Sequence, residues 1–109
     1  MKTATATATP IEQQPIRVLS DLVAEQGKCV GAGVNAENDP WFPVTQLPGE
    51  LEAQARLACS GCPVVASCLE MTLRMEQGLR RMEVEGLFGA RAPHERIALL
   101  RARRGGGAR

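Results

Sequence analysis

The stretch Cys59-Ser60-Gly61-Cys62-Pro63-Val64-Val65-Ala66-Ser67-Cys68-Leu69 holds three of the four cysteines of the chain. The remaining one, Cys29, stands alone upstream, so that the spacing is C-x29-C-x2-C-x5-C. In the C-x2-C pair two thiols straddle a tight turn and can converge on one metal ion or cluster. Three cysteines so close together, in a chain with few aromatic residues, are typical of a metal centre. We therefore expect the fold to be organised around Cys29, Cys59, Cys62 and Cys68.

The identity of the metal centre is open between two main readings. Structural zinc sites typically use two close cysteine pairs, whereas here one pair stands beside two single ligands, which favours a four-cysteine iron–sulfur cluster over zinc. Pro63 suits the first turn of a helix, which would place Cys62 at the helix start, where amides and the helix dipole favour the thiolate. Cys68 would then lie on another face of that helix and reach another corner of a bulky cluster. Disulfide pairing and four buried apolar thiols are the remaining alternatives.

The composition of the chain indicates that a metal centre is needed to stabilise the fold. The 109 residues form one domain at most, with 44% hydrophobic but only 3% aromatic residues and no Tyr. Large rings normally supply much of a small core, so Leu, Val, Ala and Met must fill this one. The opening MKTATATATP lacks the apolar segment of a secretory signal, and no window resembles a membrane span. We therefore expect a cytoplasmic protein with reduced thiols and no membrane partner.

Hydrophobic periodicity predicts an all-α fold. Apolar residues recur at helical spacing, and Gly and Pro mark the boundaries. Helices are expected at about 16–27, 49–58, 63–78 and 93–100. Residues 79–85 are ambiguous between a frayed helix and an extended stretch, and 86–89 form a turn. The expectation is thus a small helical domain of about four short helices around the cysteine centre.

The two ends of the chain have a different composition from this domain. The expected organisation is a disordered N-terminal tail at 1–14, a domain at 15–100 and a basic Arg/Gly tail at 101–109. Charge is distributed unevenly: residues 1–73 carry four basic and eight acidic side chains, net −4, and residues 74–109 carry nine Arg and four Glu, net +5. An acidic front and a basic back suggest a protein partner and a nucleic-acid partner.

At this point the motifs resemble those of the WhiB-like family of iron–sulfur transcriptional regulators. The stretch from Cys59 to Leu69 follows the family's C-x2-C-P-V-x3-C-L pattern, and a single cysteine such as Cys29 precedes it. Asp39-Pro40-Trp41-Phe42-Pro43 resembles the family's aromatic-aromatic-Pro segment, and Glu95-Arg96 resembles its Glu-Arg pair after a glycine-rich turn. The resemblance runs from about Cys29 to Arg101.

The resemblance implies a function as well as a fold. It implies that the four cysteines hold a 4Fe–4S cluster sensitive to oxygen or nitric oxide, with a disulfide in the apo form. It also implies docking on the C-terminal domain of the principal sigma factor, through Trp41, Phe42, Pro43, Leu87 and Phe88. The family's Gly-(Val/Ile)-Trp-Gly-Gly turn reads Gly86-Leu87-Phe88-Gly89-Ala90 here. Phe88 lacks the indole donor, and Ala90 resists a positive φ that Gly tolerates.

The aromatic pair and the arginines of the tail can each be interpreted as structural or as functional residues. Trp41 and Phe42 are either core residues that cover the metal site or an exposed hot spot between two prolines. The arginines of the tail are either solvated or a flexible cationic arm that contacts DNA. The candidate DNA-binding residues are Arg101, Arg103, Arg104 and Arg109. The tail lacks the Arg-Gly-Arg-Pro of an AT-hook.

An enzymatic function is not expected. No paired carboxylates accompany a nucleophile, no phosphate-binding glycine loop is present, and the single histidine, His94, is expected at the surface. We therefore expect no small-molecule substrate. The competing hypotheses are a thiol–disulfide oxidoreductase working through Cys59 and Cys62, which lacks the usual βαβ context, and a zinc-stapled interaction module.

Overall fold

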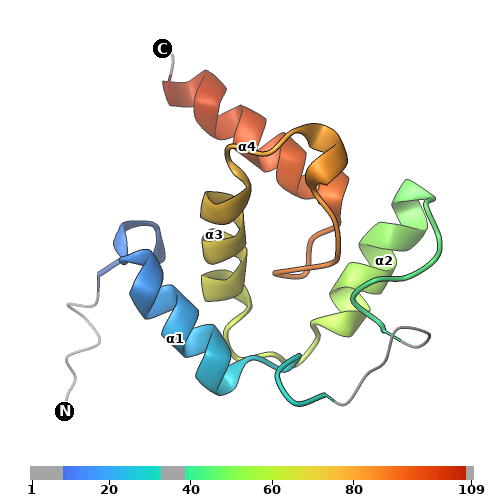
Figure 1. The fold of residues 1–109 in the computed structure, drawn as a ribbon, viewed down its shortest axis with the longest axis horizontal. Coiled ribbons are helices and arrows are strands. Elements are labelled where there is room, and N and C mark those ends of the chain that lie inside the picture. Colours follow the sequence, from blue (N-terminus) through green and yellow to red (C-terminus); the bar gives the residue numbers. More distant parts are fainter. Residues whose placement is uncertain (1–8, 33–38, 108–109) are drawn as a thin grey trace.

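The computed structural model describes residues 9–32 and 39–107, so that residues 1–8 of the expected N-terminal tail and Arg109 lie outside the described residues. The elements are η2 (Ile11–Gln13), α1 (Ile16–Gln26), α2 (Pro48–Ala58), α3 (Val65–Glu76), η3 (Arg81–Glu83) and α4 (Pro93–Gly107) (Figure 1). In these two ranges no strand occurs, and the extended pairing is limited to an isolated bridge between Phe88 and Arg91. The expected all-α fold is confirmed.

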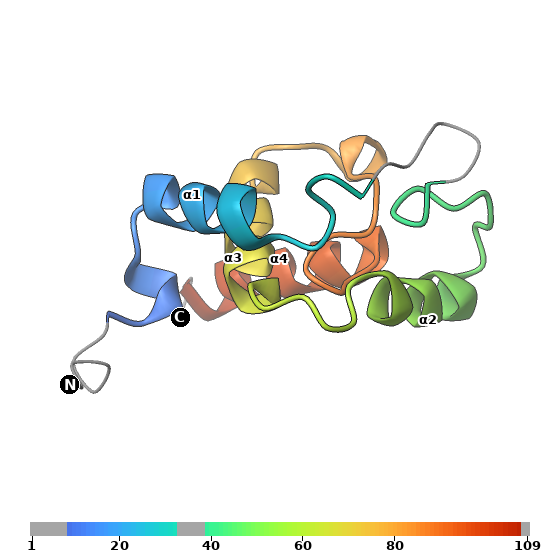
Figure 2. The ribbon, with the colours of Figure 1, turned by 90° about the horizontal axis from the view of Figure 1, so that it is seen from below.

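The third helix is the centre of the arrangement. In Figure 1, α3 has α1 beside it on one side and α4 across its far end, while α2 lies on the other side of the molecule. Figure 2 shows α1 and α4 on different sides of α3. The connection from η3 to α4 lies between α3 and α2 in both views. Segments far apart in the sequence therefore meet around the N-terminal half of α3, where Cys68 lies.

Proline and glycine set most helix boundaries, as the sequence predicts. Pro15 precedes α1, and Gly27 ends it by donating its amide to the carbonyl of Val23 at 2.8 Å. Pro48 opens α2 and Pro93 opens α4, positions where the missing amide donor is not needed. None of the helices in the described ranges is long and apolar enough to cross a membrane.

The start of α3 differs from the prediction. Val64 has φ −123° and ψ 31°, outside the helical region, so the helix begins at Val65 rather than at Pro63. The carbonyl of Val64 accepts the first helical hydrogen bond, from the amide of Cys68 at 2.8 Å. Cys62 therefore lies in the turn before the helix rather than at its first position, and Cys62 and Cys68 do not share a helix.

Both chain ends are more closely integrated than their composition suggests. Residues 9–14 include η2, and the guanidinium of Arg74 donates to the backbone carbonyls of Ile11, Glu12 and Gln14. At the other end α4 continues through the glycines to Gly107. The side chain of Arg103 is paired with Glu70 of α3, which ties this extension to the domain.

Small residues build the core around one ring. Trp41 is 8% exposed and packs in a buried cluster with Ala55, Ala58, Cys59, Leu87 and Ala92. Alanines allow α2 and the start of α4 to approach the ring closely, in agreement with the expectation that few aromatics serve this core. On the other side of the molecule Leu19 of α1 and Leu73 of α3 are buried. One buried residue, Cys59, is thus both core and candidate ligand.

A buried ion pair joins α4 to the end of α3. Arg96 is completely buried, and its guanidinium donates to both carboxylate oxygens of Glu76 at 2.9 Å. The same guanidinium donates to the carbonyls of Glu85, Gly86 and Arg91 at 2.7–2.8 Å. Because a buried charge is tolerated only when paired and fully hydrogen-bonded, Arg96 fixes the connection between η3 and α4 in place.

Candidate metal centre

Cys59 and Cys62 lie in the turn that follows α2. The amide of Cys59 closes the helix by donating to the carbonyl of Ala55 at 3.2 Å, and the amide of Cys62 donates to the carbonyl of Cys59 at 3.2 Å. Gly61 between them has φ +78°, a conformation that favours glycine. Cys59 is buried against the core, and Cys62 is half-buried. The turn therefore presents two thiols of different exposure from one short segment.

Lys28 brings the segment of Cys29 to this turn. Its backbone amide donates to Sγ of Cys62 at 3.5 Å, and its ammonium donates to the carbonyl of Ser60 at 2.8 Å. Cys29 follows directly and is exposed. Both contacts of Lys28 therefore hold the segment of Cys29 against the C-x2-C turn. No local sequence pattern around Lys28 indicates this role.

Cys68 lies one turn inside α3 and faces a different environment. Its Sγ is 3.9 Å from Oγ1 of Thr72. Burial raises the pKa of the Cys68 thiol; the hydroxyl of Thr72 and the amide of Gly89 oppose this, and the nearby Cys29 and Cys59 raise the pKa further. Cys29 and Cys59 therefore lie close enough for their charge to act on Cys68, and a positively charged centre beside Cys68 would reverse the penalty on its thiolate.

Cys29 and Cys68 also line one cavity of about 340 Å³. Its other walls are mostly apolar and come from α1, α3, the segment after α3 and the turn before α4: Val23, Met71, Thr72, Met75, Glu76, Leu79 and Phe88. An apolar wall beside thiols limits water access to the site, one of the factors that tune an iron–sulfur centre.

The donor set fits soft metal chemistry. Thiolates select zinc, copper(I) or iron–sulfur clusters, and contacts draw Cys29, Cys59, Cys62 and Cys68 toward one region. Over residues 9–32 and 39–107, no three Cys, His, Asp or Glu side chains converge tightly enough to ligate a single metal ion. His94 is not among the candidates, since its Nε2 lies 2.7 Å from the carboxylate of Glu52 in a half-exposed pair.

Trp41 and Phe42, expected either in the core or at an exposed hot spot, have different positions in the structure. The side chain of Asp39 accepts a hydrogen bond from the amide of Trp41 at 2.9 Å, and its carbonyl accepts one from the amide of Phe42 at 3.1 Å. This turn directs Trp41 into the core beside Cys59, whereas Phe42 remains 50% exposed. Pro43 is half-buried. Trp41 is therefore a core residue, and Phe42 belongs to the surface.

The turn from Gly86 to Arg91 lies against this segment. The amide of Leu87 donates to the carbonyl of Trp41 at 2.8 Å, and the Leu87 side chain is 1% exposed. The ring of Phe88 meets that of Phe42 edge-on, with centroids 5.8 Å apart and an interplanar angle of 76°. The guanidinium carbon of Arg96 lies 5.4 Å from the Phe88 centroid. Of the five candidate partner-binding residues, two are thus buried, and Phe42, Pro43 and Phe88 are accessible.

The backbone of this turn is strained at one residue. Gly89 and Ala90 both have φ +62°, and Phe88 and Arg91 exchange hydrogen bonds at 3.1 and 3.3 Å across them. Positive φ at both central positions is the requirement of a tight I′ turn, which normally selects glycine or asparagine. Ala90 adopts the conformation that its side chain was expected to resist.

The candidate DNA-binding arginines do not behave as one group. Arg101, Arg103 and Arg104 are all exposed, but only Arg103 is paired with a carboxylate, that of the buried Glu70. Arg109 lies outside the described residues. Sequence reasoning missed the burial of Arg96; its signal was the helical spacing that places Arg96 between the buried Ala92 and Leu100, four residues away on either side.

Comparison with known proteins agrees with the motif resemblance. Neither a curated protein nor a solved structure matches the chain. The family model described as "Transcription factor WhiB" matches residues 24–99, a range that contains all four cysteines, the aromatic segment and the turn before α4. On this match, which covers more than half of its length, the chain belongs to the WhiB family of transcription factors.

Proposed function

We propose that the protein is a transcriptional regulator in which Cys29, Cys59, Cys62 and Cys68 hold a 4Fe–4S cluster. The observation that carries the proposal is the contact of Lys28 with Ser60 and Cys62, because it brings the segment of the isolated cysteine to the C-x2-C turn. The family match supports iron–sulfur binding in general. The shared cavity of Cys29 and Cys68 supports their participation in the same centre.

A bound cluster would supply the redox chemistry, with sensitivity to oxygen or nitric oxide. The chain supplies the four thiolates, the amide beside Cys62 and the apolar wall beside Cys68. The ligands come from three separate segments, so metal binding and the order of these segments are coupled. In the apo protein two of these thiols would form a disulfide, with oxygen as the two-electron oxidant.

The proposed protein partner is the C-terminal domain of the principal sigma factor. The accessible residues Phe42, Pro43 and Phe88 would contact it directly. The buried Trp41 and Leu87 would act by holding the backbone of these residues in place, through the hydrogen bond between their main chains. DNA is the proposed second partner, through exposed arginines of α4.

Anaerobic purification with iron, sulfide and zinc analysis, together with a visible spectrum, tests the cluster. We expect a brown protein with about four irons and four sulfides per chain, as a four-cysteine cubane site holds. Single Cys→Ser variants at each of the four positions should lose most of the iron, whereas Ser60→Ala, in the same turn, should keep it. A colourless protein with one zinc that resists cluster reconstitution would establish the zinc module instead and remove the redox-sensing function.

Affinity for the sigma domain tests the partner surface separately. Phe42→Ala should weaken binding by about tenfold or more, the usual cost of an aromatic hot-spot residue. Val44→Ala is the matched control, because Val44 is 97% exposed and close in sequence. Equal affinities of the two variants would show that Phe42 does not contact the sigma factor.

A further inference from the structure

We propose that Arg81, Arg101 and Arg104 form a preformed groove for the phosphate backbone of duplex DNA. The inference rests on the proposed function and specifies its DNA contact. The DNA contact would then be a structured surface rather than a flexible arm. It would include Arg81 of η3, which lies outside the basic Arg/Gly tail at 101–109. It would exclude Arg103, because Arg103 is paired with Glu70.

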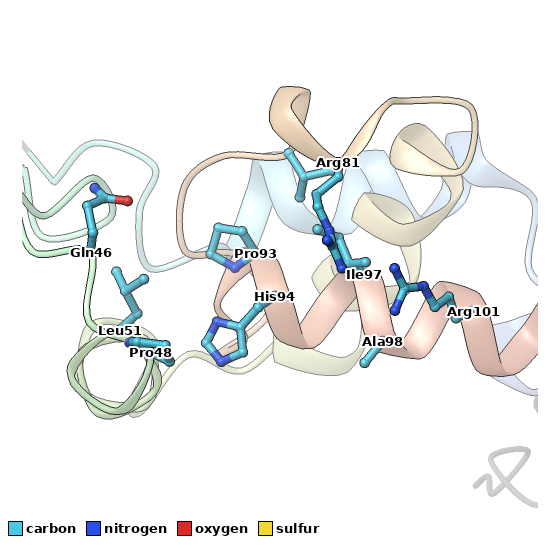
Figure 3. Close-up of a pocket in the computed structure, with 10 residues that line it drawn as sticks. Gln46, Pro48, Leu51, Arg81, Pro93, His94, Ile97, Ala98 and Arg101 are labelled. Atoms are coloured by element: carbon cyan, nitrogen blue, oxygen red, sulfur yellow. The ribbon is translucent and has the colours of Figure 1, made fainter.

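Two adjoining cavities outline the groove. One, of about 360 Å³, is lined by Arg81, Val84, Ile97 and Arg101 among others. The other, of about 200 Å³, shares these four residues and adds Arg104. Figure 3 shows Arg81 reaching from η3 toward Ile97 of α4, with Arg101 one turn further along the same helix. Side chains twenty residues apart in sequence therefore project over one hollow.

The pattern of ion pairing singles out the same residues. Within the described part of the chain, most arginines are paired with carboxylates: Arg56, Arg74, Arg80, Arg91, Arg96 and Arg103. The arginines without such a pair there are Arg17, Arg81, Arg101 and Arg104. Three of these four line the groove, and only Arg17, on α1, lies elsewhere.

The neighbouring charges leave the groove positive. Glu76 lines the second cavity, but its carboxylate is held by the buried Arg96. His94 lines the first cavity and is paired with Glu52. The remaining lining includes the apolar side chains of Val84 and Ile97, which offer the guanidiniums no competing acceptor. Three exposed guanidinium groups that have no carboxylate partner, arranged along one hollow, are complementary to a row of phosphates.

A polyanion fits this arrangement better than a single anion. The guanidinium fork binds phosphate in two parallel hydrogen bonds, and each side chain can take its own phosphate group. Arg101 and Arg104 are one turn apart on α4, and Arg81 is set beside them by a different element, so the three positions are separated along the groove. We choose duplex DNA as the occupant because the family consists of transcription factors.

Salt-dependent binding of the purified full-length protein to a fluorescent duplex of mixed sequence tests the groove. Each phosphate neutralised contributes about 0.9 to the slope of log K against log salt concentration. We expect Arg81→Gln to reduce the slope by about 0.9 and the triple variant with Arg101→Gln and Arg104→Gln to reduce it by about 2.7. Arg17→Gln, the matched control, should leave the slope unchanged. Circular dichroism should show the same helix content in all variants.

Three results would contradict DNA binding by the groove. They are an unchanged slope for Arg81→Gln, an equal loss for Arg17→Gln, or displacement of the duplex by inorganic phosphate at equal phosphate concentration. Failure of this test is distinct from failure of the proposed function, since cluster content and sigma affinity are measured on the same preparations. A protein with a cluster and sigma binding but no slope change in Arg81→Gln would retain the function and lose the groove.

Discussion

Ala90 occupies a backbone position suited to glycine. An L-residue in the left-handed region costs about 1–2 kcal/mol. Replacement by Gly would remove this strain, but the greater conformational entropy of the unfolded Gly chain would offset part of the gain. We expect Ala90→Gly to stabilise the protein by about 0.5–1 kcal/mol, measured as the shift in urea midpoint. Ala53→Gly, at an exposed position of α2, should instead destabilise by about 1 kcal/mol. Shifts of the same sign in both variants would contradict strain at Ala90.

Gly89 is required for a second reason, which is space. A Cβ built on Gly89 would lie 2.6 Å from both Cα and Cβ of Leu69 in α3. We expect Gly89→Ala to lower the free energy of unfolding by about 2–3 kcal/mol, because either the turn or α3 must shift. Gly31→Ala separates the two causes, since Gly31 has φ +74° but no heavy atom near its Cβ position. It should lose only about 1 kcal/mol.

Residue-level patterns also show what could be predicted from the sequence. The prolines that flank Trp41 and Phe42 left both rings open between a core and a surface role, and only the packing against α2 and the start of α4 buries Trp41 and leaves Phe42 exposed. The four cysteines could be named as a group from their spacing, and their common cofactor stays a prediction. Lys28 could not be found, because its role depends on a contact with residues more than thirty positions away.

At the level of elements, the connection between η3 and α4 depends on one side chain. Arg96 makes five hydrogen bonds, two to Glu76 and three to backbone carbonyls. We expect Arg96→Met to cost about 3–5 kcal/mol, because it leaves the carboxylate of Glu76 buried without a partner. The measurement is the urea midpoint.

The double variant Arg96→Met with Glu76→Leu tests the cause. Removing both charges should recover part of the loss, whereas the three carbonyls remain without their donor. A double variant as unstable as the sum of the single ones would show that the ion pair itself is not what matters. Arg91→Met is a control at a half-exposed position, and it should change stability little.

The elements were predictable where their boundary signals are local. Pro15, Gly27 and Pro93 mark helix ends through their own backbone restrictions, and these ends lie where expected, whereas α2 begins at Pro48, one residue before the expected start. The start of α3 was misplaced because Pro63 belongs to the cysteine turn. The η2 turn and the continuation of α4 were missed, since Arg74 and the Glu70–Arg103 pair hold them from other elements.

For the whole molecule, stability should fall in acid through Glu95. The hydrogen bonds from Arg56 lower the pKa of Glu95 from 4.5 to about 2. A carboxylate with a depressed pKa contributes its full stabilisation above the unfolded value, and that contribution is lost as the pH falls from about 4.5 to about 2. Because Arg56 is half-exposed, we expect about 1 kcal/mol from the pair.

Unfolding free energies between pH 6 and pH 2 for the protein and for Glu95→Gln check this. The difference between the two should be constant above about pH 5 and shrink toward zero in acid. A difference independent of pH would contradict the role of the Glu95 charge. Burial opposes ionisation of Glu70, but the hydrogen bonds from Arg103 and Arg74 outweigh it and lower its pKa, so Glu70 acts in the same direction.

The two contacts of Lys28 also have a topological consequence. They bring residue 28 to residues 60–62, so the intervening chain, which carries Trp41, Phe42 and α2, forms a ring closed at a narrow neck. The free-energy cost of closing such a ring, which comes from lost chain entropy, increases only by ~0.6 kcal/mol for each doubling of its length. The exposed parts of the ring can therefore gain or lose residues at small thermodynamic cost. Opening the neck would free Cys29 from the C-x2-C turn, whereas Trp41 would remain held by its packing against α2 and its hydrogen bond with Leu87.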